Sequence, residues 1–403
     1  MSTSLTAFSQ EDWTTANRIL CIRLDSLGDV LMTTPAMRAI KETNPQAHLT
    51  LMTSGAGGAM APKGQSSTIA SLLPIIDETL IYDAPWLKAT ASRKDSQPEY
   101  AMFEHLRQQQ FDAAIIFTVY SQNPLPSAFM AYMADIPLRL AYCRENPYQL
   151  LTHTVKELEP EQFIRHEVQR QLDLVASVGY HTTNPRMTLE IPLKAQKRVA
   201  LLLSELGLPA NSWVVIHPGA SAPSRRYPPE QFAQVADSLI AQGIPVVFTG
   251  TEPERPLIDS IRAQMEAPAL SLVGMLDLAE MAALLQTAPL LLSNNTGPVH
   301  LAAAVGTPVV DLYALTNLQH TPWGVPNRVL FHDVPCRLCY KSICPEGHQD
   351  CLRLVEPGQV VDAVLELLNE TQVDRSCKDW IPPAPLGKGG VGEDLLEVAM
   401  RLR

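Results

Sequence analysis

Residues 18–37 read RILCIRLDSLGDVLMTTPAM. An apolar run of strand length ends at Arg23, a polar turn follows, and a stretch with the period of a helix begins near Val30. The same order of short apolar run, turn and helical stretch recurs along most of the chain. Strands that alternate with single helices pair in parallel and are joined by right-handed crossovers. This pattern predicts a protein of the α/β class.

Two series of such units follow one another. The first has expected strands at 18–23, 48–53, 79–82 and 112–118, and expected helices near 30–43, 99–109 and 162–178. The second has expected strands at 213–217, 244–249, 289–293 and 308–312, and expected helices near 194–206, 229–242, 254–265, 277–286, 297–305 and 357–369. Each series is long enough for a doubly wound sheet, so we expect two Rossmann-like domains, at 1–185 and 186–370. Residues 371–403 contain PPAP and GKGG and are expected to form a flexible extension with a short helix at 393–402.

The composition excludes several classes of protein. Hydrophobic residues make up 46% of the 403 residues and charged residues 18%, which excludes intrinsic disorder of the whole chain. No apolar run approaches the roughly 18 residues of a membrane span. The net charge of -11 makes nucleic acid an unsuitable partner, because such binding requires cations that neutralise phosphates. The first residues, MSTSLTAFSQEDW, lack the pattern of a secretory signal, so we expect a cytoplasmic protein.

The turn at residues 23–29 is the first candidate site, since ligands of open α/β sheets bind beyond the carboxyl ends of the strands. Asp29 lies where the first long helix is expected to begin, and the helix dipole would stabilise its ionised form. An alternative is that Asp25 or Asp29 only caps this helix.

The loop at residues 217–228, HPGASAPSRRYP, is the second candidate. Ser221 and Arg225 could bind phosphate oxygens through hydroxyl, backbone N–H and guanidinium groups. Glu254 follows the expected strand at 244–249, and its carboxylate could accept hydrogen bonds from both hydroxyls of a ribose. The alternatives are a solvated loop and an acid that only compensates a helix N-terminus.

The third candidate is residues 293–300, SNNTGPVH, where another strand ends and a helix begins. Asn295 or Thr296 can cap this helix, and its free N–H groups near Gly297 form an anion site. His300 could add a further donor, although a histidine on a helix is also common as a purely structural group.

Four of the seven cysteines lie within residues 336–351: Cys336, Cys339, Cys344 and Cys351. Four thiolates at this spacing can close a tetrahedral site for Zn²⁺ or Fe. The alternatives are a disulfide or free reduced thiols. With four protein ligands and no open position, such a metal would be structural.

Four blocks of the sequence, in this order, resemble the signature blocks of glycosyltransferase family 9, the ADP-heptose heptosyltransferases of lipopolysaccharide assembly and their relatives. They are ILCIRLDSLGDVLMTTPAMRAIK (19–41), HEVQRQLDLVASVG (166–179), VVIHPGASAPSRRYPPEQFAQVA (214–236) and LLLSNNTGPVHLAAAVGTPVVDLY (290–313). The resemblance covers roughly residues 17–369 and extends to the cysteine cluster, which holds a metal in some members.

The resemblance implies a GT-B fold, in which two Rossmann-like domains face each other across a cleft. The N-terminal domain would take a glycan or lipid-linked saccharide acceptor, in peripheral contact with the inner membrane face. The C-terminal domain would take the nucleotide-sugar, by default ADP-heptose. The implied reaction is an inverting transfer without a catalytic metal.

Individual positions match the motifs of this family. Asp29 matches the general base, Glu254 the ribose-binding carboxylate, and Asn295 a residue that contacts the transferred sugar. The leaving diphosphate would be stabilised by the helix that starts at Thr296 and Gly297, with His300, and by the loop from Ser221 to Arg225.

Three positions depart from the family pattern. Asn295 replaces the usual Asp, Arg225 the usual Lys, and Tyr227 the usual Trp, which leaves the donor sugar open. Alternatives are therefore transfer of a different sugar or transfer to a protein acceptor. Outside this class, an NAD-dependent oxidoreductase lacks support because no G-x-G-x-x-G follows the first strand. A non-catalytic scaffold would not require the acid and histidine at these positions.

Overall fold

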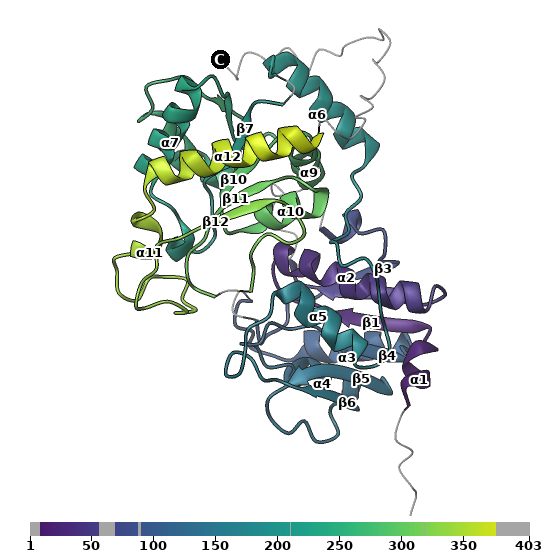
Figure 1. The fold of residues 1–403 in the computed structure, drawn as a ribbon. Coiled ribbons are helices and arrows are strands. Elements are labelled where there is room, and N and C mark those ends of the chain that lie inside the picture. Colours follow the sequence, from purple (N-terminus) through teal and green to yellow (C-terminus); the bar gives the residue numbers. More distant parts are fainter. Residues whose placement is uncertain (1–8, 56–68, 88–89, 210, 318, 376–403) are drawn as a thin grey trace, which may run out of the picture. The chain divides into compact units, whose positions relative to one another are not determined.

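The computed structural model describes residues 9–55, 69–87, 90–209, 211–317 and 319–375. Figure 1 shows the order of the elements along the chain. The chain divides into two compact units. The described part of the first unit comprises residues 9–190, with the same gaps, and residues 319–323. The described part of the second unit comprises residues 191–317, again with the same gaps, and residues 324–375. A short segment from the second half of the chain thus belongs to the first unit.

The first unit contains a six-stranded parallel sheet in the order β3-β2-β1-β4-β5-β6. Its strands are β1 (Arg18–Ile22), β2 (His48–Thr53), β3 (Glu78–Ile81), β4 (Ala113–Ile116), β5 (Leu138–Cys143) and β6 (His153–Lys156). Its helices are α1 (Gln10–Thr14), α2 (Leu27–Thr43), α3 (Gln97–Gln108), α4 (Leu125–Met133) and α5 (Glu167–Ala176). The strand order reverses between β1 and β4, and such a switch point is where doubly wound sheets bind ligands.

The second unit repeats this topology, with the parallel order β12-β11-β10-β7-β8-β9. Its strands are β7 (Val214–His217), β8 (Val246–Phe248), β9 (Leu270–Ser271), β10 (Leu291–Asn294), β11 (Val309–Leu312) and β12 (Asn327–Leu330). Its helices are α6 (Leu193–Leu206), α7 (Pro229–Ala241), α8 (Arg255–Arg262), α9 (Leu278–Thr287), α10 (Gly297–Val305), α11 (Asp350–Arg353) and α12 (Pro357–Arg375). Here the order reverses between β7 and β10.

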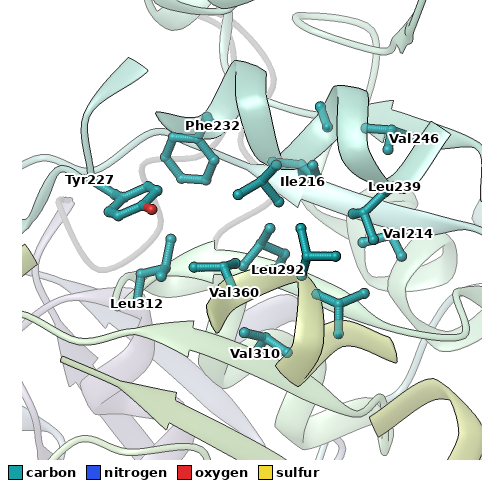
Figure 2. Close-up of a cluster of buried hydrophobic side chains, with 14 of the residues drawn as sticks. Val214, Ile216, Tyr227, Phe232, Leu239, Val246, Leu292, Val310, Leu312 and Val360 are labelled. Carbon is teal, nitrogen blue, oxygen red and sulfur yellow. The ribbon is translucent and has the colours of Figure 1, made fainter. Parts of the chain in front are cut away.

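The core of the second unit explains why its strands read as apolar runs. Ile216, Leu292 and Leu312 project from one face of the sheet, and Phe232 of α7 and Val360 of α12 belong to the same buried cluster (Figure 2). Because successive side chains of a strand alternate between faces, the opposite face must be buried as well. All four residues of β7, β10 and β11 are buried, so helices cover both faces of the sheet.

Each strand expected from the sequence is present, and the prediction of two doubly wound parallel sheets is confirmed. Within the described residues, strands β5, β6, β9 and β12 were not predicted, nor were helices α1, α4 and α11. Helix α12 continues to Arg375, past the residue at which the flexible extension was expected to begin; the expected helix at 393–402 lies outside the described residues. In the described part of the chain, no helix is long and apolar enough to cross a membrane.

Candidate functional site

Asp29 lies in the first turn of α2, directly after the turn that follows β1. Ser26 is the N-cap residue, and its backbone N–H and its Oγ donate to Asp29 Oδ2 at 3.1 and 2.6 Å. On the other oxygen, Arg23 Nη2 lies 3.1 Å from Oδ1 and His320 Nε2 lies 3.9 Å from it. The capping alternative is therefore realised by Asp29, and the same contacts hold its carboxylate in one place.

Arg23 joins three carboxylates although it is completely buried. Its guanidinium lies 3.0 Å from Asp25, 3.1 Å from Asp29 and 2.8 Å from Glu167. Burial by itself would lower the pKa of Arg23, but the three carboxylates outweigh it and raise this pKa, so the guanidinium stays charged. Gln171 donates to the Glu167 oxygen at 2.6 Å, which completes a buried polar network beneath Asp29.

Asp25 lies at the edge of a pocket of about 670 Å³ within the first unit. Gln122, which follows β4, donates to its carboxylate, so the contact spans the switch point between β1 and β4. Burial raises the pKa of Asp25 to about 6, against the opposing charge of Arg23. The pocket is lined by both polar and apolar residues; the others are Leu24, Ser26, Ser54, Gly55, Asp83, Leu87, Thr90, Ala91, Ser92 and Arg93.

In the second unit, a row of polar side chains crosses the carboxyl end of the sheet. Ser293 of β10 is in register with His217 of β7 on one side and with Asp311 of β11 on the other. His217 Nδ1 lies 3.2 Å from Oγ1 of Thr249, the residue after β8. All four side chains are buried. Because the burial of polar groups costs free energy, their presence marks this end of the sheet as a candidate site.

The loop after β7 is anchored to the neighbouring strands. Asn294 at the end of β10 donates to the Pro218 carbonyl at 2.7 Å and accepts from the backbone N–H of Tyr227 at 3.0 Å. Within this loop Ser221 is exposed and Arg225 is partly buried. Tyr227 is in the core and donates to the Val355 carbonyl at 2.8 Å, so the departure from Trp at this position concerns packing.

Glu254 belongs to the short turn Glu252–Glu254 before α8 and faces the loop after β7. It accepts from the backbone N–H and from Oγ1 of Thr251 at 2.7 and 2.8 Å, so the alternative of a helix-start carboxylate is realised. A Cβ on Gly219 would lie 1.9 Å from its Oε1, so only glycine leaves room for this carboxylate. Burial lowers the pKa of His217, and the charge of Glu254 opposes that effect, as expected for groups that lie close together.

The predicted helix start after β10 is present. Thr296 is the N-cap residue, Gly297 begins α10, and His300 is buried in the first turn. Asn295 is also buried, and its Nδ2 donates to Asp311 Oδ2 at 2.9 Å. Asp311 was not predicted as a site residue; an acid inside the buried run PVVDLY is the signal that could have identified it.

The cysteine-rich segment, residues 336–351, contacts the loop that holds Arg225. The Lys341 carbonyl accepts from Ser224 Oγ at 2.7 Å and the Ser342 carbonyl accepts from its backbone N–H at 3.0 Å. Gln349 donates to the Pro223 carbonyl at 3.1 Å. The segment therefore braces one of the loops at the carboxyl end of the sheet.

The four cysteines of this segment are free thiols and partly buried. Burial is the main cause that raises the pKa of Cys351, and the charges of the other three cysteines raise it further. His348, which the sequence analysis did not consider, lies 3.8 Å from Cys336 Sγ through its Nε2. Sulfur and imidazole suit Zn²⁺ or Fe, although among the described residues no three such side chains are already arranged around one ion.

Comparison with known proteins agrees with these observations. The family model for glycosyltransferase family 9 (heptosyltransferase) matches residues 100–349, more than half of the chain. Lipooligosaccharide heptosyltransferase 2 of Haemophilus influenzae is 29% identical over 238 residues, which are 55% of this chain and 66% of that protein.

Two solved structures share the fold. The family 9 glycosyl transferase of Veillonella parvula has a TM-score of 0.72 at 22% identity, over 88% of this chain and 98% of that one. The ADP-heptose lps heptosyltransferase II of Escherichia coli has a TM-score of 0.66 at 21% identity, over 88% and 99%. The match to the family model over more than half of the chain establishes that this chain is a glycosyltransferase and belongs to glycosyltransferase family 9.

Proposed function

We propose that this enzyme transfers heptose from ADP-heptose, with inversion, to a glycan acceptor of lipopolysaccharide or another cell-surface polymer. The names of its relatives support heptose as the sugar, and one of the similar structures is of an enzyme named for ADP-heptose. The observation that carries the proposal is the carboxylate of Asp29, fixed at the start of α2 by Ser26 and Arg23.

Asp29 acts as the general base. Its carboxylate takes the proton of the acceptor hydroxyl while that oxygen attacks the anomeric carbon, and the bond from this carbon to the diphosphate breaks. The electron pair leaves with the diphosphate, so one carboxylate is sufficient. Arg23 and Ser26 hold the carboxylate in position and do not themselves react.

The second unit binds the donor. The N-terminus of α10, with Thr296, Gly297 and His300, stabilises the charge of the leaving diphosphate. Ser221 and Arg225 bind its oxygens from the loop after β7. Glu254 accepts hydrogen bonds from the ribose, and Asn295 contacts the transferred sugar; both follow strands at the carboxyl end of the sheet.

The pocket beside Asp25 receives the acceptor. Its lining of carboxylate, amide, hydroxyl and guanidinium groups suits a saccharide with many hydroxyls. This pocket shares the β1–α2 turn with Asp29, since Asp25 and Ser26 line it. A different sugar or a protein acceptor would use the same base and the same donor contacts.

The cysteine-rich segment holds a structural Zn or Fe ion, with Cys336, Cys339, Cys344 and Cys351 as ligands. Such an ion would hold the segment against Ser224 and so brace the loop that carries Arg225. The transfer itself needs no catalytic metal. The enzyme works in the cytoplasm, in peripheral contact with the membrane that carries the acceptor, and without nucleic acid.

A panel of nucleotide-sugars tests the proposed donor. Binding to the native state raises the melting temperature by mass action, and ADP-heptose should raise it more than UDP- or GDP-sugars do. Transfer is then measured with lipid-linked core saccharides and with a protein acceptor. A larger shift with another nucleotide-sugar would contradict heptose as the transferred sugar. Transfer to the protein alone would contradict the glycan as the acceptor.

A further inference from the structure

Asp311 is a destabilising residue in the sheet of the second unit. It lies within β11 and is completely buried. Asn295 donates to its Oδ2 at 2.9 Å, while its Oδ1 has no hydrogen-bond partner among the described residues. A buried carboxylate with an unsatisfied oxygen lowers the stability of the fold, so an apolar residue would serve a purely structural strand better.

The groups that favour the ionised form of Asp311 both come from the donor side of the unit. Burial dominates and raises the pKa of Asp311 well above its usual value, although the hydrogen bond from Asn295 and the charge of Arg225 act in the opposite direction. Asn295 follows β10 and Arg225 belongs to the turn after β7. These two strands flank the point at which the strand order reverses.

The contact with Asp311 also determines the orientation of the Asn295 side chain. The Asn295 amide presents its NH₂ group to Asp311, because Nδ2 donates to Oδ2, and a carboxyl oxygen accepts this bond in both the protonated and the ionised form of the acid. Its carbonyl oxygen, Oδ1, is then directed away from Asp311 and can only act as an acceptor. Sugar hydroxyls are donors that such an oxygen can bind.

We propose that Asp311 is a positioning residue for the donor sugar, which fixes the Asn295 amide so that Oδ1 accepts a hydroxyl of that sugar. This inference rests on the proposed role of Asn295. It also explains why position 295 carries an amide in this chain, since a second carboxylate there would lie within hydrogen-bond distance of a buried acid and would be repelled.

A double-mutant cycle of four proteins tests the proposal. These are the wild type, Asp311→Asn, Asn295→Asp and the exchanged protein, which carries both substitutions. The readouts are the melting temperature and the dissociation constants of ADP-heptose and of ADP. Asp311→Leu is measured beside the cycle, because asparagine at position 311 keeps an acceptor for the Asn295 amide. Asp311→Leu should weaken ADP-heptose binding by about 10-fold, the loss expected for one hydrogen bond between neutral groups, and Asp311→Asn should weaken it less. ADP binding should stay constant in both variants, and their melting temperatures should not fall, since a buried acid with an unsatisfied oxygen is removed.

Asn295→Asp should lower the melting temperature, because it brings two buried carboxylates together. The exchange should restore both the melting temperature and ADP-heptose binding to near the wild-type values, because an acid and an amide again face each other. A matched control is Asp237→Asn on α7, where the acid accepts from the backbone of Glu266 and Ala267; it should leave ADP-heptose binding unchanged.

Equal affinity of the wild type and Asp311→Leu for ADP-heptose would overturn this inference and leave the proposed function intact. Additive effects of the two single substitutions in the exchanged protein would overturn it as well. Failure of the wild type to bind ADP-heptose contradicts the proposed donor itself, and the four melting temperatures would then still report whether residues 295 and 311 are coupled.

Discussion

Glu167 Oε1 lies 2.8 Å from Arg23 Nη1, and neither side chain is exposed to solvent. Arg23 directly follows β1 and Glu167 begins α5, so this ion pair joins two of the sequence blocks that resemble the family. The pair lies beneath Asp29, which shares the same guanidinium.

The two halves of this ion pair should differ in their importance for stability. Arg23→Met leaves buried Glu167 without its cation, and we expect a loss of about 3–5 kcal/mol in the free energy of unfolding. Glu167→Gln should cost less, because Arg23 keeps Asp25 and Asp29 as partners. Urea unfolding at pH 7 measures both. A larger loss for Glu167→Gln would show that Arg23 does not hold the network together.

Asp29→Asn should abolish most of the turnover while donor binding stays intact. Loss of a general base lowers the rate by about 10²–10⁴-fold. The measurement is kcat for sugar transfer together with the dissociation constant of the nucleotide-sugar. Asp135→Asn is a matched control, since Asp135 is exposed and its positive φ of 57° suits Asn. Normal turnover of the Asp29 variant would eliminate this carboxylate as the base.

Asp25 makes the stability depend on pH. Its pKa is raised from 3.8 to about 6, so the folded state binds more protons than the unfolded state between these values. Stability therefore falls as the pH rises from about 4 to about 6 and stays low above that range. The shift corresponds to at most about 3 kcal/mol at 1.36 kcal/mol per unit.

Asp25→Asn tests this dependence. The variant should lose most of the decline between pH 4 and 6 and should be the more stable protein at pH 7, as measured by urea unfolding at several pH values. A wild type whose stability rises over this interval would contradict the raised pKa.

His300→Ala should weaken binding of the leaving group. We expect the dissociation constant of ADP to rise by about 10- to 100-fold, the loss of one hydrogen bond to a charged group. His332→Ala is the control, because His332 is exposed in the same unit. Calorimetry with ADP compares the two, and an ADP affinity that the first substitution does not change would exclude a contact between His300 and the diphosphate.

Substitutions in the cysteine-rich segment should weaken donor binding through the contact with Ser224. Cys339→Ser should remove bound Zn or Fe from the purified protein, as elemental analysis would show, and should raise KM for the nucleotide-sugar. Ser224→Ala removes only the contact of 2.7 Å to Lys341, so it should raise KM and leave the metal content unchanged. Purified wild type without Zn or Fe would refute the metal, and an unchanged KM in Ser224→Ala would refute the brace.

The sequence predicts what depends on local patterns. Residues 18–29 contain the pattern of a strand, a capping box and an acid, and the structure has all three. The helix start at Gly297 is equally local, because Thr296, Pro298 and the following apolar residues define it. Strands β6 and β12 were missed because they are short edge strands that are only partly buried, and β9 has two residues.

Partners that come from distant parts of the chain could not be predicted. Arg23 meets Glu167 only because α5 packs beside α2, and Asn295 meets Asp311 only because β10 and β11 are neighbours in register. His320 approaches Asp29 because residues 319–323 belong to the first unit, which no periodicity indicates. A pattern identifies Asp29 and Asn295, whereas their environment follows from the fold.

Residues 319–323 belong to the first unit, which limits how the protein can be divided into fragments. The Gln319 carbonyl accepts from the Glu167 backbone N–H at 3.0 Å, the Thr321 carbonyl lies 2.8 Å from His166, and Trp323 donates to Pro185 at 2.8 Å. A fragment that stops at residue 190 loses all three contacts together with His320. The first half expressed alone would therefore need a peptide spanning 319–323 added in trans, whereas in split-enzyme complementation the fragment that begins at residue 191 supplies this segment.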